Sequence, residues 1–387
     1  MPIKNRFAEL HDEITAWRRD LHEHPELMFD THRTAATVAE KLRAFGCDDV
    51  TEGIGRTGVV GVIKGKQSVS GKTIGLRADM DALPIFEDTG LPYASKTEGV
   101  MHACGHDGHT AMLLGAAKYL CETRHFDGTC VVIFQPAEEG GGGGREMCDD
   151  GLMTRWNIDE VYGMHNWPGM PTGSFHIRPG PFFAATDTFE IDVRGLGGHA
   201  AKPNETVDTT VLASNMVLAF QSIASRNADP VKQLVVSVTS FETESKAFNV
   251  IPEQVTLRGT VRTLDPDTRD LARRRLTEIA THTASAYGGS ATVNYMDGYP
   301  VMVNHEEPTE FVSDVARSVS GDLQKAPLVM GGEDFAFMLE ERPGAYILVG
   351  NGDTAMVHHP KYNFNDDAIP AGCSWWADII ETRMPAA

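Results

Sequence analysis

Apolar residues recur at steps of three and four near the start of the chain, the spacing that gives a helix one buried face. This pattern predicts a first helix over residues 4–24. Its apolar positions are Ile3, Phe7, Leu10, Ile14, Trp17 and Leu21. A second helix is predicted over 31–45, where Gly46 provides a stop signal.

Strand and helix patterns then alternate through the first half of the chain. The strands are predicted at 57–64, 73–78, 129–134 and 161–164, with a helix at 109–122. Strands that alternate with helices predict a sheet covered by helices on both faces. The first half of the chain therefore has the pattern of an α/β domain.

The middle of the chain has a different order of elements, β-α-β-β-α-β. The strands are predicted at 188–193, 233–241, 254–261 and 290–294, and the helices at 207–226 and 266–287. This order is typical of a ferredoxin-like unit. After it come a helix at 306–318, a strand at 345–349 and a closing helix that runs to residue 382.

These patterns predict two domains. Residues 1–185 and 304–387 are expected to form a larger α/β domain, a mixed central sheet with helices on both faces. Residues 186–303 are expected to form a smaller α+β domain inserted into it.

Composition and charge narrow the class of function. The 387 residues include 34 Lys and Arg against 54 Asp and Glu, a net charge of −20. Such a balance repels nucleic-acid phosphate and anionic lipid, so neither nucleic acid nor a membrane is an expected partner. The six cysteines are scattered, no apolar stretch approaches the length of a membrane span, and the N-terminus lacks the apolar core of a signal peptide. We therefore expect a cytoplasmic protein.

Four segments carry the residue types that bind metal ions. They are the turn with Cys104 and His106, the strand end with Glu138 and Glu139, the strand end with His165, and the loop with His358 and His359. Each has a simpler interpretation by itself: a buried cysteine, a solvated glutamate pair or a structural histidine. Together they supply enough thiolate, imidazole and carboxylate ligands for two divalent ions, about 3.5–4 Å apart.

A run of five glycines, 140–144, follows the glutamate pair. It lacks the Lys-Ser/Thr of a phosphate-binding loop. We interpret it either as a flexible turn between a strand and a helix or as a place where the backbone approaches a ligand.

Six motifs, in order along most of the chain, resemble one known family. They are LRADMDALP (76–84), MHACGHDGHT (101–110), FQPAEEGGGG (134–143), GMHNWPG (163–169), GGHAAKP (197–203) and GGEDFAFM (331–338). They are similar to the amidohydrolase subfamily of the aminoacylase/carboxypeptidase metallopeptidases, which includes hippurate hydrolase. The resemblance implies a zinc-exopeptidase-like catalytic domain and an inserted lid and dimerisation domain. It also implies hydrolysis of small N-acyl amino acids by a homodimer or a dimer-based tetramer.

The resemblance also assigns a cofactor, two divalent ions per subunit. It implies metal ligation by five residues, Cys104, His106, Glu139, His165 and His358, with Cys104 bridging the ions. His359 is an ambiguous neighbour of His358, and the donor set admits Mn²⁺, Zn²⁺, Co²⁺ or Ni²⁺. The wider superfamily has His-x-Asp in the strand where this chain has Asp79-Met80-Asp81. Asp81 is expected to lie beside the metal site and support its ligands.

The remaining roles also come from the resemblance. Glu138 is expected to be the general base that takes a proton from the attacking water. His199 is expected to stabilise the oxyanion in the active site of a partner subunit. Asn249 and Arg262 are expected near the free carboxylate of the substrate, although Arg262 could instead pair with an acid on its strand face. Gly331, Gly332 and Glu333 are expected to shape the substrate end of the cleft.

Three other functions remain open at this point. An exopeptidase or dipeptidase on the same scaffold would differ only in its substrate pocket. A thiol hydrolase would use Cys104 as nucleophile and survive metal removal. A catalytically silent metal-binding or ligand-sensing protein would need neither a base nor an oxyanion donor, and the chain retains Glu138 and His199.

Overall fold

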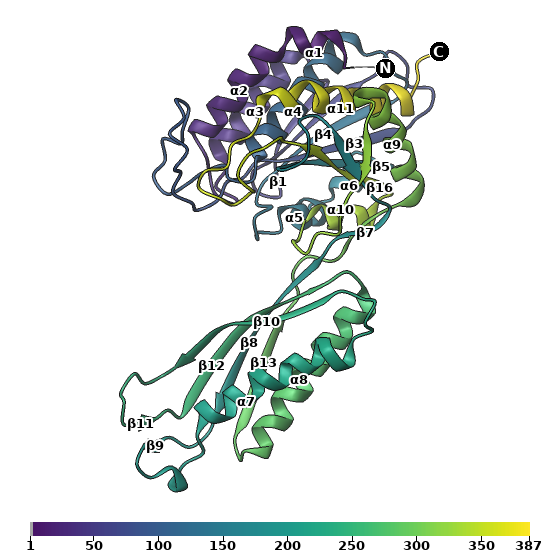
Figure 1. Ribbon diagram of the computed structural model, residues 1–387. Coiled ribbons are helices and arrows are strands. Elements are labelled where there is room, and N and C mark those ends of the chain that lie inside the picture. The colour runs from purple at the N-terminus through teal and green to yellow at the C-terminus, as the bar shows by residue number, and fades with distance from the viewer. Residues whose placement is uncertain (1–2) are drawn as a thin grey trace. The chain divides into compact units, whose positions relative to one another are not determined.

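The chain divides into two compact units in a computed structural model that describes residues 3–387 (Figure 1). The first unit contains residues 3–180, Val303–Pro327 and Asp334–Ala387, and the second contains Pro181–Met302 and Leu328–Glu333. The backbone therefore passes between the units at four places, 180/181, 302/303, 327/328 and 333/334. Within the described residues, no helix combines the length and apolar character that a membrane span requires.

The first unit is built on an eight-stranded sheet, in the order β1-β2-β4-β3-β5-β16-β6-β15. The strands are β1 (Asp49–Ile54), β2 (Gly58–Lys64), β3 (Thr73–Asp79), β4 (Thr129–Gln135), β5 (Glu160–Trp167), β6 (Phe175–Ile177), β15 (Leu323–Lys325) and β16 (Gly344–Gly350). β3 pairs in parallel with β4 and β5, and β16 with β5, whereas β2 is antiparallel to β1 and β4. The predicted mixed central sheet is confirmed.

Helices cover both faces of this sheet (Figure 1). They are α1 (Asn5–Glu9), α2 (His11–Glu23), α3 (His32–Phe45), α4 (His106–Thr123), α5 (Gly143–Asp149), α6 (Leu152–Arg155), α9 (Glu306–Ser320), α10 (Phe335–Glu341), α11 (Ile369–Arg383) and the short η3 (Asp366–Ala368). In Figure 1, α4 and α11 lie above the sheet and α5, α6 and α10 lie below it. Because the inner strands β3, β4, β5 and β16 are covered on both faces, they are buried along nearly their whole length.

The helix expected over residues 4–24 is in fact two helices, α1 and α2. The break is at Leu10, whose N–H still bonds to the carbonyl of Arg6 while its φ and ψ are −87° and −2°. Phe7, Leu10 and Ile14 all remain buried. The apolar spacing therefore continues across the break, which is why the periodicity did not reveal it.

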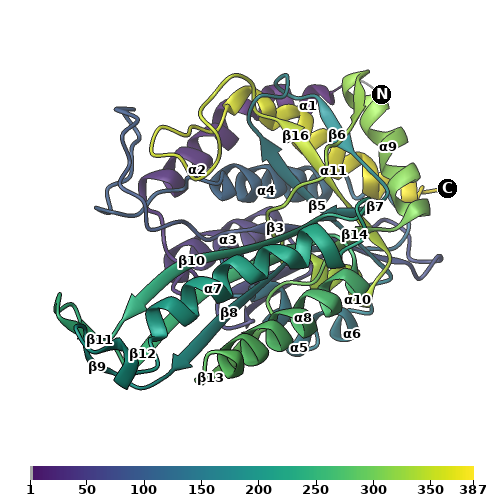
Figure 2. The same ribbon diagram turned by 60° about the horizontal axis from the view of Figure 1, so that its bottom comes forward.

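The second unit has the predicted β-α-β-β-α-β order. Its main elements are β8 (Ala185–Arg194), α7 (Thr209–Ser222), β10 (Leu234–Thr243), β12 (Gln254–Thr263), α8 (Pro266–Ala286) and β13 (Ser290–Met296). The strands form an antiparallel sheet in the order β10-β12-β8-β13, and α7 and α8 lie on one face of it (Figure 2). This is the ferredoxin-like arrangement that the sequence indicated.

Short elements complete the chain. They are β7 (Gly180–Phe183) with β14 (Met302–Asn304), β9 (Gly198–His199) with β11 (Val250–Ile251), and the helical turns η1 (Pro203–Glu205) and η2 (Ile223–Asn227). Most of them were not expected, because two to five residues are too few to show a period.

Candidate metal centre

The predicted metal-binding residues gather in the first unit, beside the carboxyl ends of β4 and β5 and the start of α4. Their ligand atoms form three overlapping groups, in each of which all atoms lie within 4.8 Å of one another. The groups are Cys104, His106 and His165; Cys104, Glu139 and His358; and His106, Glu138 and Glu139. Four segments that are far apart in the sequence therefore converge on one place, and Cys104 belongs to two of the groups.

The two buried histidines are held so that one ring nitrogen is free to bind a cation. His106 Nδ1 lies 2.9 Å from the carbonyl oxygen of Asp81, and His165 Nδ1 lies 2.5 Å from that of Asn166. A carbonyl can only accept, so each Nδ1 carries a proton, and in the neutral ring each Nε2 keeps its lone pair. His106 Nε2 is buried with no hydrogen-bond partner, and His165 Nε2 lies 3.3 Å from Cys104 Sγ. This is how histidines that ligate metals are usually oriented.

Glu139 and His358 complete the cluster. Glu139 Oε1 lies 3.3 Å from His358 Nε2 and 3.9 Å from His106 Nε2, yet it is buried with no properly aligned hydrogen bond. The backbone of His358 is left-handed, with φ of 66°, and its N–H bonds to the carbonyl of Ala103 at 2.7 Å. His359 belongs to none of the groups within residues 3–387. The geometry thus favours His358 over its neighbour.

The charges around this cluster favour a cation. Burial lowers the pKa of His106, but the carboxylates of Asp79, Asp81 and Glu139 outweigh burial and raise that pKa to about 10. Burial, together with Glu139 and Glu138, raises the pKa of the Cys104 thiol well above its usual value. A divalent cation would replace the proton on His106 and allow Cys104 to ionise. The sulfur, nitrogen and oxygen donors fit a borderline-soft divalent ion.

Asp81 supports the turn that carries the two glutamates. Its Oδ1 accepts from the N–H of Glu138 at 3.0 Å and its Oδ2 from the N–H of Glu139 at 3.1 Å. Ala137, just before them, has a left-handed backbone with φ of 54°. Burial raises the pKa of Asp81, which is fully enclosed. The side-chain carboxylate of Asp81 therefore holds the backbone of both glutamates, while the backbone carbonyl of Asp81 orients the ring of His106.

The glycine run connects β4 to α5 and packs tightly against its own chain. A Cβ on Gly143 would lie 1.8 Å from the carbonyl oxygen of Pro136. The N–H of Gly144 bonds to Asp334 Oδ2 at 2.8 Å. The run is therefore a turn between a strand and a helix, as one of the two interpretations proposed, and Gly143 is also needed for close backbone packing.

A buried polar network beside the cluster was not predicted. Asp79 accepts from His109 Nδ1 at 2.6 Å and from Arg77 Nη1 at 2.8 Å. Arg77 also donates to Gln135 and Asp334. The signal that could have revealed this network is the pair of charges, Arg77 and Asp79, inside an otherwise apolar strand, because buried charges need partners.

The family model for "Peptidase family M20/M25/M40" matches residues 75–382. The chain belongs to this peptidase family. A hippurate hydrolase of Campylobacter jejuni is 43% identical over 383 residues, 98% of each chain. A thermostable carboxypeptidase of Saccharolobus solfataricus is 40% identical, over 96% of this chain and 95% of its own. The structure described as a dinuclear metal-binding peptidase of the M20 family from Bacillus subtilis has a TM-score of 0.86 at 32% identity, over 97% of this chain and 99% of its own.

These relatives and the family match make the chain a metal-dependent amidohydrolase. Two of the expected residues of this M20 chain lie side by side in the second unit. His199, in β9, pairs with Val250 of β11, and the N–H of Ala200 bonds to the carbonyl of Asn249 at 3.0 Å. His199 and Asn249 are both exposed. His199 Nδ1 accepts from the N–H of Ala201 at 3.1 Å, so the neutral ring carries its proton on Nε2.

Arg262 and Gly332 of the M20 chain lie near each other elsewhere in the second unit. Arg262 is opposite Thr186 in the sheet, and a Cβ on Gly332 would lie 2.3 Å from the Thr186 side chain. Arg262 lies toward the end of β12 that is far from β11, eight residues, or about 26 Å, beyond Gln254 at the start of that strand. Within one chain, His199 and Asn249 therefore form one pair, and Arg262 and Gly332 form a separate one.

The Arg262 guanidinium is half-buried and bonds to Thr260 Oγ1 and to two backbone carbonyls, those of Val261 at 3.2 Å and Asp187 at 3.4 Å. The nearby Asp187 carboxylate is instead paired with Arg269. No carboxylate among the described residues forms an ion pair with Arg262, so the expected alternative, a pair on its strand face, is absent from residues 3–387.

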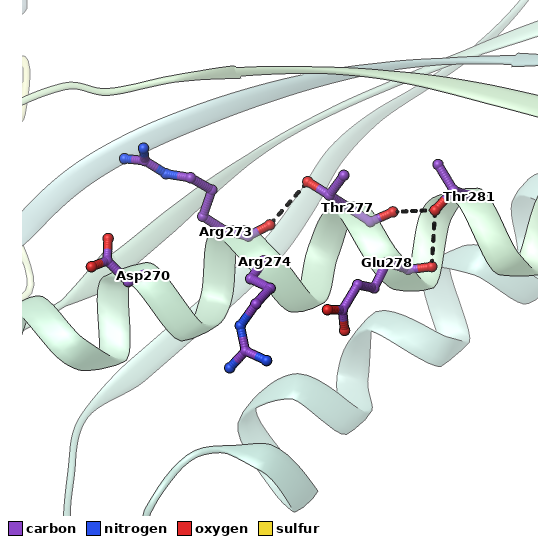
Figure 3. A pocket seen from close by; sticks show the side chains of 6 residues that line it. All are labelled: Asp270, Arg273, Arg274, Thr277, Glu278 and Thr281. Atoms are coloured by element: carbon purple, nitrogen blue, oxygen red, sulfur yellow. Dashed lines mark hydrogen bonds between the residues drawn. The ribbon is translucent and has the colours of Figure 1, made fainter.

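A surface hollow also runs along α8 of the M20 chain (Figure 3). Its lining side chains all come from this one helix, and none of the predicted site residues is among them. They are Asp270, Arg273, Arg274, Thr277, Glu278 and Thr281. Thr277 and Thr281 turn their hydroxyls back to carbonyls of the same helix. The hollow is a charged helix surface without converging catalytic groups.

Proposed function

We propose that this chain hydrolyses the amide bond of N-acyl amino acids, including hippurate-like substrates with an aromatic acyl group. The products are a carboxylic acid and a free amino acid. The observation that carries the proposal is the convergence of Cys104, His106, Glu139, His165 and His358 beside Glu138. The full-length similarity to a hippurate hydrolase supports this substrate class.

We propose that these five residues would hold two divalent cations per subunit, and Cys104 belongs to two of the ligand groups. Such ions supply two kinds of chemistry: they lower the pKa of water and they polarise the amide carbonyl. Mn²⁺, Zn²⁺, Co²⁺ and Ni²⁺ all suit the donor set.

Glu138 is the proposed general base and acid. It accepts a proton from the attacking water as the water oxygen bonds to the amide carbon, and it returns the proton to the nitrogen as the C–N bond breaks. Glu138 is buried, and its backbone N–H is held by Asp81. Since Asp81 holds Glu138 and Glu139 in one turn, one carboxylate can bind cations while the other handles the proton.

His199 is proposed to donate a hydrogen bond from Nε2 to the oxyanion that forms on the substrate. The support is its tautomer, because the hydrogen bond from Ala201 to Nδ1 leaves the proton on Nε2. We place this histidine in the active site of a partner subunit, so the working form is a homodimer or an assembly of such dimers. The separation of the His199 pair from the Arg262 pair within one chain agrees with sites shared between subunits.

The dimer is proposed to form along β10 and α7. β10 is an edge strand ten residues long, and Val235 and Phe241 on it are 38% and 40% exposed. On α7, Val211 and Leu218 are 49% and 70% exposed. A long apolar edge strand favours pairing with another chain. The α8 side carries charged residues instead, so it is not the proposed interface.

Arg262, with Asn249 and Gly332, is proposed to recognise the free carboxylate of the substrate. A guanidinium without an internal carboxylate partner is suited to bidentate binding of an external one. We also propose a reducing compartment, the cytoplasm, because all six cysteines are free thiols.

Carboxypeptidase action on short peptides is a second candidate, favoured by the 40% identity to a thermostable carboxypeptidase. A thiol hydrolase is disfavoured, because burial and the neighbouring glutamates raise the pKa of Cys104 and keep its thiol protonated.

The test is metal analysis of the purified protein followed by a substrate panel. We expect two ions per chain, activity on acylated amino acids such as hippurate, loss of activity with a chelator, and recovery when one of the four cations is added. Preference for dipeptides would favour the carboxypeptidase. Activity that survives metal removal would indicate the thiol enzyme, and no activity with metal loaded would indicate a silent binding protein.

A further inference from the structure

Asn166 lies at the point where the segments carrying the proposed ligands meet. It follows His165 at the end of β5 and its side chain is fully buried. Its Nδ2 donates to the carbonyl of Cys104 at 2.7 Å and lies 3.0 Å from His109 Nε2. Its Oδ1 accepts from the hydroxyl of Tyr362 at 2.7 Å. One amide therefore connects the turn before α4, the end of β5 and the loop that follows His358.

The hydrogen bonds fix the direction of this amide. The Cys104 carbonyl can only accept, so the nitrogen of Asn166 must face it, and the oxygen faces Tyr362. The backbone N–H of Asn166 also donates to His109 Nε2, at 2.9 Å. His109 Nε2 is consequently an acceptor and its Nδ1 donates to Asp79. Every polar atom of the Asn166 side chain is thus used, as a buried amide requires.

The turn that Asn166 holds leaves no room for a side chain at its centre. Gly105 separates Cys104 from His106 and has φ of 90°. A Cβ there would lie 2.2 Å from Asn166 Nδ2 and 2.3 Å from Tyr362 Oη. The amide and the phenol therefore pack directly on the backbone that aims the thiol and the imidazole.

We propose that Asn166 is a positioning residue for the metal centre: its side-chain amide holds the Cys104–His106 turn, the His165 strand end and the His358 loop in the geometry that binds cations. It touches neither substrate nor cation and acts through the ligands. The inference rests on the proposed metal centre. Groups that orient metal ligands in this way typically change metal affinity by about 10–100-fold when removed.

The test uses the full-length chain loaded with Co²⁺, whose absorption spectrum reports on thiolate and imidazole ligation. Asn166→Leu keeps a side chain of similar size and removes its three hydrogen bonds. We expect Co²⁺ affinity to fall about 10–100-fold and the thiolate-to-cobalt charge-transfer absorption to weaken or shift. An unchanged affinity and spectrum would overturn the proposal.

The matched control is Asn304→Leu. Asn304 is also buried in the first unit, and its amide donates to the carbonyls of Arg178 and Tyr346 and accepts from the N–H of Tyr346. None of these partners carries a proposed ligand, so this variant should lose stability but keep the wild-type spectrum and affinity. If Asn304→Leu altered both as much as Asn166→Leu, Asn166 would have only a general structural role.

A milder variant, Tyr362→Phe, removes only the hydrogen bond to Asn166 Oδ1 and keeps the ring. This variant tests the proposal if Asn166→Leu does not fold. A smaller loss of Co²⁺ affinity with the same spectral change supports the proposal, whereas a Co²⁺ affinity and spectrum equal to those of the wild type overturn it. The wild-type chain separates this inference from the proposed function. A wild-type chain that binds no Co²⁺ refutes the metal centre itself, whereas binding that Asn166→Leu leaves intact refutes only the role of Asn166.

Discussion

The two adjacent glutamates, Glu138 and Glu139, have different surroundings although they are neighbours in the chain. Glu139 Oε1 faces His358 and His106, whereas Glu138 shares a group with His106 and Glu139 but with neither Cys104 nor His358. A carboxylate that moves protons and one that binds cations should respond differently to the same substitution.

Glu138→Gln is expected to lower kcat by about 10²–10⁴-fold and to leave two bound ions per chain, because the amide cannot take the proton from water. Glu139→Gln should instead lose metal, since it removes a charged ligand. The measurement is metal content by elemental analysis beside steady-state kinetics. A Glu138→Gln chain with full turnover, or one without metal, would contradict these roles.

Much of this site could be predicted from the residues because its ligands are chemically distinctive and stand at strand ends. The residue types and positions of Cys104, His165 and the glutamate pair indicate candidate metal ligands. Asn166 and His109 do not, because an asparagine or a second histidine in a motif has no chemistry of its own until its partners are known. Only the fold shows that their hydrogen bonds connect the ligand segments.

At the scale of elements, the start of α4 depends on one residue. Gly105 is the N-cap of α4 and has a left-handed backbone. Gly105→Ala would add a Cβ that overlaps Asn166 and Tyr362, so we expect metal affinity to fall at least about tenfold, the lower limit for disturbed ligand orientation, together with a lower Tm. Isothermal titration and thermal unfolding measure both effects.

Gly46→Ala is the matched control for that substitution. Gly46 ends α3 with φ of 87°, and nothing lies within 4 Å of a Cβ placed on it. The variant should lose about 1 kcal/mol of stability from backbone strain and bind metal as the wild type does. Equal metal affinity in both alanine variants would show that the space around Gly105 is unimportant.

The long elements were predictable because their periods persist over many residues. α3 and α8 begin and end within a residue of the expected positions, since Gly46 and Pro266 mark their ends clearly. β1 was not expected, because it is largely exposed and has no alternating apolar positions. At Leu10 the backbone departs from the regular α-helix, but the buried face continues across the break. A hydrophobic pattern reflects only burial, so it could not predict this break.

At the scale of the whole molecule, the C-terminal helix is tied to the central sheet by a charge cluster. Arg383, the last residue of α11, pairs with Glu160 at the start of β5, at 2.9 Å. Burial raises the pKa of Glu160, but hydrogen bonds from Arg383, Lys72 and Tyr162 outweigh it and lower that pKa to about 2. An unfolded glutamate titrates near about 4.3. The pairing therefore stabilises the fold fully above about pH 4.3, and this stabilisation is lost as the pH falls toward 2.

Arg383→Gln is expected to cost about 1–3 kcal/mol at pH 7, toward the lower end because Arg383 is partly exposed. The difference from the wild type should shrink as the pH is lowered from 5 toward 3, as urea unfolding at each pH can measure. Arg317→Gln, whose partner Asp314 is exposed, should change stability by less than about 0.5 kcal/mol at any pH. A constant difference for Arg383→Gln between pH 7 and 3 would rule out this linkage.

The proposed dimer interface can be tested by adding one carboxylate to α7, which is part of that interface, and one to α8, which is not. Leu218→Glu places a carboxylate on the apolar face of α7 and is expected to shift the chain toward monomers and to lower activity, since His199 would lose its site in the partner. Thr281→Glu, on the charged face of α8, should leave the assembly intact. Light scattering after size exclusion measures the mass. A Leu218→Glu chain with the wild-type mass would place the interface elsewhere.

The four places where the backbone passes between the two units have a consequence for how the molecule can be cut. A protease that cleaves at any one of these junctions divides the chain into two fragments, while the backbone still passes between the units at the remaining three junctions. The smaller unit cannot be excised as one continuous fragment either, because residues Leu328–Glu333 return to it from a later part of the chain. Because all six cysteines are free thiols, no disulfide joins the two fragments of a nicked chain, and packing within each unit alone should hold them together. A truncation that isolates the unit with the eight-stranded sheet needs two separate deletions, each bridged by a new linker.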